Sequence, residues 1–239
     1  MIYAEILAAG SGSRMGNTEL PKQFLKLGSK PIIIHTIEQF LLNNKIDKIL
    51  VCTSKDWVGY VEDLIKKYIP ARNKIVVIEG GATRDETVMS GCDYIEKEYG
   101  VKKGDIIITH DAVRPFITQR IIEENITAMK EADAVDTCIK ATDTIIETYH
   151  NDEKYIKTIP NRNYMYQGQT PQTFSLKTLI TLHNSLSEEE KKTLTDACKI
   201  FALKDQKVKV VEGEVYNIKI TTMFDLKLAN AILLERGEK

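Results

Sequence analysis

MIYAEILAAGSGSRMG, residues 1–16, places an apolar strand directly before a loop rich in glycine and serine. The strand runs from Ile2 to Ala9 and carries a single charge, Glu5, within its apolar run. In a parallel α/β sheet, ligands bind beyond the carboxyl ends of the strands. Small residues there let backbone N–H groups approach phosphate oxygens closely. The stretch therefore predicts a parallel α/β sheet with a ligand site at the end of its first strand.

The alternation of strands and helices continues through the first half of the chain. Further apolar strands are expected at Lys48–Thr53, Lys74–Ile78 and Ile106–Thr109, and a helix is expected at Ile32–Leu42. Apolar residues at helical spacing predict more helices between these strands, around 58–68, 88–99 and 122–129. Near-continuous apolar strands that alternate with helices indicate a sheet covered on both faces. The fold class is therefore α/β with a mostly parallel sheet.

This rhythm breaks once, at residues 139–163. Asp143–Tyr149 and Tyr155–Ile159 are expected to form two strands around the turn His150–Lys154. Such a hairpin does not fit a β–α unit, so we expect it to project as an arm. Arms of this kind often pair subunits, although an ordinary edge hairpin fits the sequence equally well. We predict a single domain over residues 1–239, with the arm used in a homodimer.

Composition excludes several classes of protein. The 239 residues hold 33 Lys and Arg against 34 Asp and Glu, a net charge of −1, which argues against a nucleic-acid partner or an anionic membrane surface. No uncharged apolar run approaches the ~18 residues of a membrane span. The start lacks a basic leader, and the four widely spaced cysteines are expected to be reduced. We therefore expect a cytoplasmic protein.

The first loop carries cations as well as glycines. Its spacing, G-x-G-x-x-x-G, is not the dinucleotide fingerprint, and no G-K-[ST] follows, which excludes a P-loop. Arg14 lies within the loop and Lys22 just after it. Arg and Lys usually serve as solubilising surface residues, but in a glycine-rich loop at a strand end they favour neutralisation of a polyphosphate.

Five ordered segments resemble one known family. They are residues 7–23, which end in Pro21-Lys22-Gln23, and the motifs Glu79-Gly80-Gly81-Ala82-Thr83-Arg84, His110-Asp111-Ala112-Val113-Arg114-Pro115, Gln169-Thr170-Pro171-Gln172 and Asn217-Ile218-Lys219-Ile220-Thr221. In this order they resemble the cytidylyltransferases that act on 2-C-methyl-D-erythritol 4-phosphate and on ribitol 5-phosphate. The resemblance covers nearly the whole chain and implies a Rossmann-like, three-layer nucleotidyltransferase fold.

The resemblance also implies the reaction and its residues. CTP and a polyol phosphate would give a CDP-polyol and pyrophosphate, with Mg²⁺ as cofactor and Asp111 as its ligand. The catalytic residues implied are Arg14, Lys22 and Lys219. The nucleotide-binding residues implied are Ala8, Ala9, Gly10, Gly12, Gly80, Gly81, Thr87, Asp111 and Ala112. The acceptor-binding residues implied are Arg114, Thr144, Arg162, Thr170 and Thr195.

Several of these residues also have a purely structural interpretation. Gly80 and Gly81 could simply form a turn, Asp111 could cap one, and Arg114 could pair with Asp111. Lys219 is expected on an apolar strand, where a solvent-pointing lysine is the alternative to a phosphate ligand. Thr144 and Arg162 lie in the arm, and in the family such residues reach a neighbouring subunit's site. His110 is expected to be structural, and the capping position of Asp225 explains that residue without a function.

Three positions depart from the methylerythritol pattern and resemble the ribitol branch. They are Val113 in the second motif, Ala197 after Thr195-Asp196, and Tyr216 before Asn217. The favoured acceptor is therefore ribitol 5-phosphate, which would supply CDP-ribitol for teichoic acid or capsule synthesis, and methylerythritol phosphate is the alternative. A nucleotide-binding regulatory protein that has lost catalysis is the competing class. Acceptor-dependent release of pyrophosphate would distinguish the two.

Overall fold

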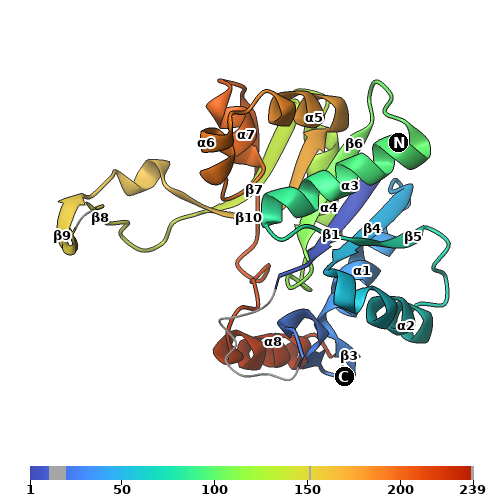
Figure 1. Ribbon diagram of the computed structural model, residues 1–239. Helices are drawn as coiled ribbons and strands as arrows, with labels where there is room; N and C mark the ends of the chain where they lie inside the picture. Colours follow the sequence, from blue (N-terminus) through green and yellow to red (C-terminus); the bar gives the residue numbers. More distant parts are fainter. Residues whose placement is uncertain (11–19, 151, 238–239) are drawn as a thin grey trace.

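The computed structural model describes residues 1–10, 20–150 and 152–237. Within these ranges the chain forms a seven-stranded sheet in the order β11-β7-β10-β6-β1-β4-β5 (Figure 1). Its strands are β1 Ile2–Ala8, β4 Lys48–Thr53, β5 Ile75–Glu79, β6 Ile106–Asp111, β7 Ala134–Lys140, β10 Tyr166–Ser175 and β11 Val208–Glu212. β1 pairs in parallel with β4 and β6, whereas β10 runs antiparallel to β6 and β7. The predicted mostly parallel α/β sheet is confirmed.

Helices cover both faces of the sheet because side chains alternate along each strand. Ala4 and Ile6 of β1 pack on one face, where α1 and α2 lie, while Tyr3 faces the side of α3 and α5. The helices are α1 Ile32–Leu41, α2 Val58–Tyr68, α3 Arg84–Tyr99, α4 Gln119–Ala128, α5 Leu176–Asn184, α6 Glu188–Lys192, α7 Cys198–Leu203 and α8 Met223–Glu235, with short 3₁₀ turns η2 Lys22–Phe24, η3 Lys55–Trp57 and η4 Arg162–Tyr164.

Three helix starts among the described residues form capping boxes. In α3 the Thr83 hydroxyl accepts a hydrogen bond from the Glu86 backbone N–H, and the Glu86 carboxyl group accepts one from the Thr83 backbone N–H. Ser187 caps α6 in the same way, and Thr222 caps α8 with Asp225. α8 packs against Leu27, Val113 and Ile220. Val113 also lines the cavity described next.

The predicted arm is present, with a shorter first strand and a longer second strand than expected. β8 spans Glu147–Tyr149 and β9 spans Asp152–Thr158, so the second strand begins three residues earlier than expected and the first begins four residues later. The arm extends to one side of the body in Figure 1. Every residue of β8 and β9 is exposed. The single-domain organisation stays a prediction.

Among the described residues, no helix combines the length and apolar character needed to cross a bilayer. All four cysteines, Cys52, Cys92, Cys138 and Cys198, are buried and free, as the sequence led us to expect.

Candidate active site

The carboxyl ends of β1 and β6 and the loop after β5 border one cavity of about 390 Å³. Segments far apart in the sequence contribute to it, since parallel strands end at the same edge of a sheet. The lining residues are Leu7, Ala8, Ala9, Gly10, Lys22, Gln23, Gly81, Ala82, Thr83, Arg84, Thr87, Asp111, Ala112, Val113 and Lys219.

The wall next to β1 is fixed by Gln23. Its side-chain Nε2 donates to the Ala8 carbonyl at 2.6 Å and to the Gly10 carbonyl at 3.3 Å, and the residue is buried. Lys22 begins the 3₁₀ turn η2 and lines the cavity beside Gln23. Gln23 therefore ties the end of β1 to the segment that carries Lys22. Gly12 and Arg14 lie outside the described residues.

The loop between β5 and α3 approaches its neighbours too closely for larger residues. A Cβ on Gly80 would lie 2.9 Å from the Thr87 methyl carbon, and one on Gly81 would lie 2.2 Å from the Glu86 Cβ. The Thr87 hydroxyl donates to the Thr83 carbonyl at 2.7 Å. Packing at the start of α3 thus explains both glycines, and Gly81 and Thr87 also face the cavity.

Asp111, at the end of β6, collects three cationic side chains. Its Oδ1 accepts from an Arg84 Nη atom at 2.5 Å, and its Oδ2 lies 3.1 Å from Arg114 Nε and 3.0 Å from Lys219 Nζ. Burial alone would raise the pKa of Asp111, but Arg84, Lys219 and Arg114 together lower it well below its usual value. Asp111 is therefore a carboxylate at neutral pH, and the cluster keeps an excess of positive charge.

A buried network holds Asp111 and Arg114 in place. Arg114 donates to the Asn217 carbonyl at 2.7 Å, and the Thr170 hydroxyl accepts from the Asp111 N–H at 3.1 Å. The same hydroxyl is bonded to His110 Nδ1 at 3.0 Å. Burial lowers the pKa of His110 to about 3, so the imidazole is neutral and serves structure, as expected.

The predicted acceptor residues do not gather at the cavity within one chain. Thr170 is buried behind Asp111, and Arg114 is also mostly buried beside it. Thr195 is exposed in the loop before α7, and it is not among the residues that line the cavity. Thr144 and Arg162 are exposed in the arm, which extends away from the body (Figure 1). Of the predicted cations, Lys22 and Lys219 line the cavity within a single chain, and the arm residues do not.

One structural expectation for Lys219 is wrong. The segment Tyr216–Thr221 is not a strand but an irregular connection between β11 and α8. The Asn217 side chain holds this connection, because its Nδ2 donates to the Thr170 carbonyl at 2.8 Å. Lys219 reaches Asp111 from this connection, with its side chain 36 % exposed.

Sequence reasoning missed Arg84 as a site residue. Arg84 is the first residue of α3, follows the capping Thr83 directly and lines the cavity. The sequence held a sign of this role. Arg84 follows the glycine pair of the third strand's end and the helix-capping threonine, and this position lies at the ligand-binding end of a parallel sheet.

Asp111 supplies a carboxylate that could bind a metal ion in the cavity. Among the described residues, no group of three or more His, Cys, Asp or Glu side chains could hold a metal ion. Mg²⁺ prefers six oxygen ligands and commonly takes them from one or two carboxylates, substrate phosphates and water. The two oxygens of Asp111 already contact three cationic side chains, so Asp111 could supply only part of a Mg²⁺ site. A bound polyphosphate would have to supply further ligands.

Comparisons with known proteins identify the family of the chain. Residues 2–235 match the family model described as IspD: 2-C-methyl-D-erythritol 4-phosphate cytidylyltransferase. The chain is 55 % identical over 237 residues to a protein of Lactiplantibacillus plantarum named ribitol-5-phosphate cytidylyltransferase, covering 99 % of this chain and 100 % of that one.

Solved structures show the same fold. A 4-diphosphocytidyl-2C-methyl-D-erythritol synthase from Anaerococcus prevotii matches with a TM-score of 0.79 and 30 % identity, over 98 % of each chain. A 2-C-methyl-D-erythritol 4-phosphate cytidylyltransferase from Francisella tularensis matches with a TM-score of 0.78 and 28 % identity, over 96 % of this chain and 98 % of that one. The family predicted from the five motifs is confirmed: the chain belongs to the IspD family of cytidylyltransferases.

Proposed function

We propose that the protein transfers the cytidylyl group of CTP to D-ribitol 5-phosphate, which gives CDP-ribitol and pyrophosphate. The cavity supports the reaction class, because Lys22, Arg84 and Lys219 line it together with the carboxylate of Asp111. The observation that carries the choice of acceptor is the 55 % identity, over the full length of both chains, to a protein named for ribitol 5-phosphate.

The chemistry asks mainly for electrostatic support. The acceptor's phosphate oxygen attacks the α-phosphorus of CTP in line, and pyrophosphate leaves on the opposite side. A phosphate nucleophile is already ionised at neutral pH, so no general base is required. Lys22 and Lys219 hold the phosphates near each other and stabilise the charge that develops on the leaving group. Arg14 has the same proposed role.

Mg²⁺ is part of the proposal. It would be held by Asp111 together with oxygens of the triphosphate, and when bound it neutralises charge on the phosphates. Removal of divalent cations with EDTA should abolish turnover, and an excess of Mg²⁺ should restore it. Full activity in EDTA would contradict the cofactor.

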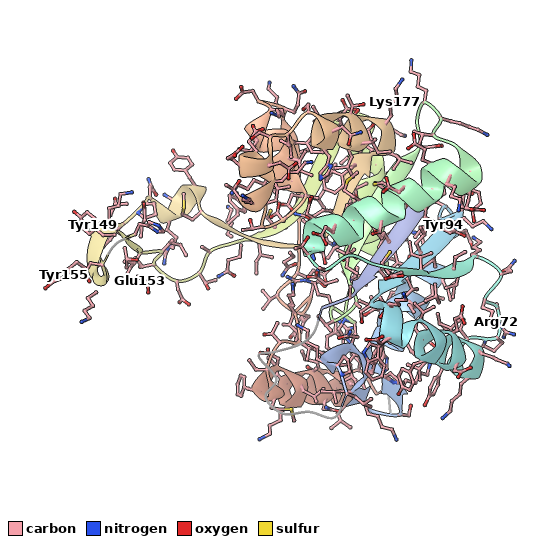
Figure 2. All side chains as sticks on the ribbon, in the orientation of Figure 1. Arg72, Tyr94, Tyr149, Glu153, Tyr155 and Lys177 are labelled. Atoms are coloured by element: carbon pink, nitrogen blue, oxygen red, sulfur yellow. The ribbon has the colours of Figure 1, made fainter. Side chains whose placement is uncertain are left out.

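The working form is proposed to be a homodimer built through the arm. The arm carries exposed apolar side chains that a monomer would leave in water, including Tyr149, Tyr155 and Ile156, each at least half exposed. Figure 2 shows Tyr149 and Tyr155 on the arm, well away from the sheet. A partner that covers them would also receive Thr144 and Arg162 near its own cavity. The context proposed is cytoplasmic synthesis of precursors for teichoic acid or capsule.

Methylerythritol 4-phosphate is the second candidate acceptor, favoured by the description of the family model. The test is a panel of CTP with ribitol 5-phosphate, with methylerythritol 4-phosphate and with no acceptor, read as pyrophosphate release. We expect release with ribitol 5-phosphate to be the fastest by far. Equal rates for the two acceptors would refute the assignment of the acceptor, and release without any acceptor would indicate a hydrolase. Nucleotide binding with no release in any arm would indicate a regulatory protein.

A further inference from the structure

The three cationic side chains around Asp111 differ in how strongly their surroundings restrain them. Arg114 is anchored, since its side chain is 10 % exposed and also donates to the Asn217 carbonyl. Arg84 is 26 % exposed and starts from a backbone position fixed by the α3 capping box. Lys219 is 36 % exposed and lies in an irregular connection. Lysine also has a flexible stem and a compact charge, whereas arginine offers a planar fork. Lys219 is therefore the partner that can leave.

The two carboxylate oxygens of Asp111 contact different numbers of these cations. Oδ2 faces both Arg114 and Lys219, whereas the ion pair to Oδ1 comes from Arg84. If Lys219 moves toward a phosphate, Arg114 still satisfies Oδ2 and Arg84 still satisfies Oδ1. If Arg84 is lost, Oδ1 loses its strong partner, and the carboxylate must rely on Arg114 and Lys219 for both oxygens.

We propose that Arg84 is a positioning residue, which holds the Asp111 carboxylate so that Lys219 can exchange its ion pair for the phosphates of the nucleotide. Asp111 then serves as a resting partner for Lys219 in the empty site. The inference rests on the proposed function for the nucleotide, and it adds the step that releases Lys219.

Two further observations favour a positioning role over direct binding of the nucleotide. Burial alone would lower the pKa of Arg84, but nearby acidic groups, Asp111 first, raise it overall, and the ion pair of the guanidinium is with Asp111. Its Nε atom is buried and has no hydrogen-bond partner among the described residues, so this donor is not presented to the cavity. The side chain is thus committed mainly to Asp111.

A double-mutant cycle tests the inference through the affinity for CTP. The dissociation constant for CTP is measured by calorimetry at fixed Mg²⁺, without acceptor, for the unaltered protein, Arg84→Gln, Asp111→Asn and the double variant. Arg84→Gln should weaken CTP binding about ten- to a hundredfold, the size of one charge-assisted hydrogen bond. In the Asp111→Asn background the same change should alter the constant less than about twofold, because the group that Arg84 positions is no longer charged.

Losses that multiply in the double variant would overturn the inference, because they would mean that Arg84 binds the nucleotide independently of Asp111. Equal CTP binding by Arg84→Gln and the unaltered protein would overturn it too, while leaving the proposed function standing. No CTP binding by the unaltered protein would overturn both.

Two further variants guard against an effect on folding. Arg84→Lys keeps the charge, so it should bind CTP more tightly than Arg84→Gln does. In the Asp111→Asn background, Arg84→Lys should cause no further loss of CTP affinity. Arg72→Gln removes an arginine that lies between α2 and β5 and is not among the residues that line the cavity, so it should leave CTP binding unchanged. Loss of affinity in Arg72→Gln equal to that in Arg84→Gln would overturn the inference, since it would reflect the overall charge of the protein.

Discussion

Replacement of Glu5 by glutamine should make the protein more stable at alkaline pH. Glu5 lies in the middle of β1, fully buried beneath α3, where its Oε1 accepts from the Cys52 thiol at 3.2 Å. Its Oε2 is buried without a hydrogen-bond partner among the described residues. Burial raises the pKa of Glu5 from 4.5 to about 8, although the Cys52 thiol and Arg84 act in the opposite direction.

The sign follows from the two pKa values. In the folded chain Glu5 stays protonated up to about pH 8, whereas in the unfolded chain it ionises near pH 4.5. The unfolded state therefore binds fewer protons between these values, and stability falls by about 1.4 kcal/mol per pH unit as the pH rises. Because the slope flattens near the folded pKa, the loss between pH 6 and pH 8 is about 2 kcal/mol. Glutamine has no such dependence.

Urea unfolding at pH 6, 7 and 8 measures the effect as the difference between Glu5→Gln and the unaltered protein. This difference cancels the titration of every other group, including His110. It should grow in favour of the variant by about 2 kcal/mol from pH 6 to pH 8. Glu153→Gln, on the exposed arm (Figure 2), should show no such growth. A difference that is constant over this range would refute the reasoning, because it would mean that Glu5 does not titrate differently in the two states.

Three other perturbations have defined outcomes. Gly91→Ala should lower the free energy of unfolding by about 1–3 kcal/mol in urea, because its Cβ would lie 2.3 Å from a carboxylate oxygen of the buried glutamate in β1. Gly59→Ala, with open space around the new methyl group, should be neutral or stabilising; equal losses would count against the packing argument. Lys219→Ala should reduce kcat ~10²–10³-fold while the protein still folds, as checked by circular dichroism, and Lys227→Ala on α8 should keep full turnover; normal kcat in the first would remove Lys219 from the mechanism. Tyr155→Glu should convert the proposed dimer to a monomer in light scattering, and an unchanged mass would exclude this part of the arm from the interface.

The sequence predicted the parallel part of the fold well because its signals are local. Apolar strands such as Lys48–Thr53 match the observed bounds, and each capping box needs only residues three positions apart. Glycines and helix caps in turn mark where strands end, so the position of the cavity could also be predicted.

The strand β10 could not be predicted from such signals. It contains Gln169-Thr170-Pro171-Gln172, and a proline among polar residues argues against a central strand. Partners distant in sequence make its burial possible, since Gln169 donates to the Glu214 carbonyl and Thr170 accepts from Asp111. Polar residues can lie in the centre of a sheet when partners such as these take up most of their hydrogen bonds, and a single sequence does not show these partners.

The arrangement around Asp111 was equally out of reach. Arg84, Arg114 and Lys219 come from three segments, and Lys219 lies on a connection whose path depends on Asn217. The resemblance implied roles for Arg114 and Lys219 but not for Arg84, and the division of partners between the two carboxylate oxygens is a property of the folded site.

The return path of the arm leads directly into β10, a strand of the central sheet. β10 starts at exposed Tyr166, where it pairs with Lys140 of β7, and by Thr170 it is buried and bonded to Asp111. The arm is therefore anchored at its base and unconstrained at its tip. Residues can be gained or lost near His150 during evolution without moving anything in the sheet. A change of one residue between Tyr166 and Thr170 would shift the pairing of this part of β10 by one position and withdraw the threonine hydroxyl from Asp111. Related proteins should accordingly vary in the reach of the arm and keep the length of the strand between Tyr166 and Thr170.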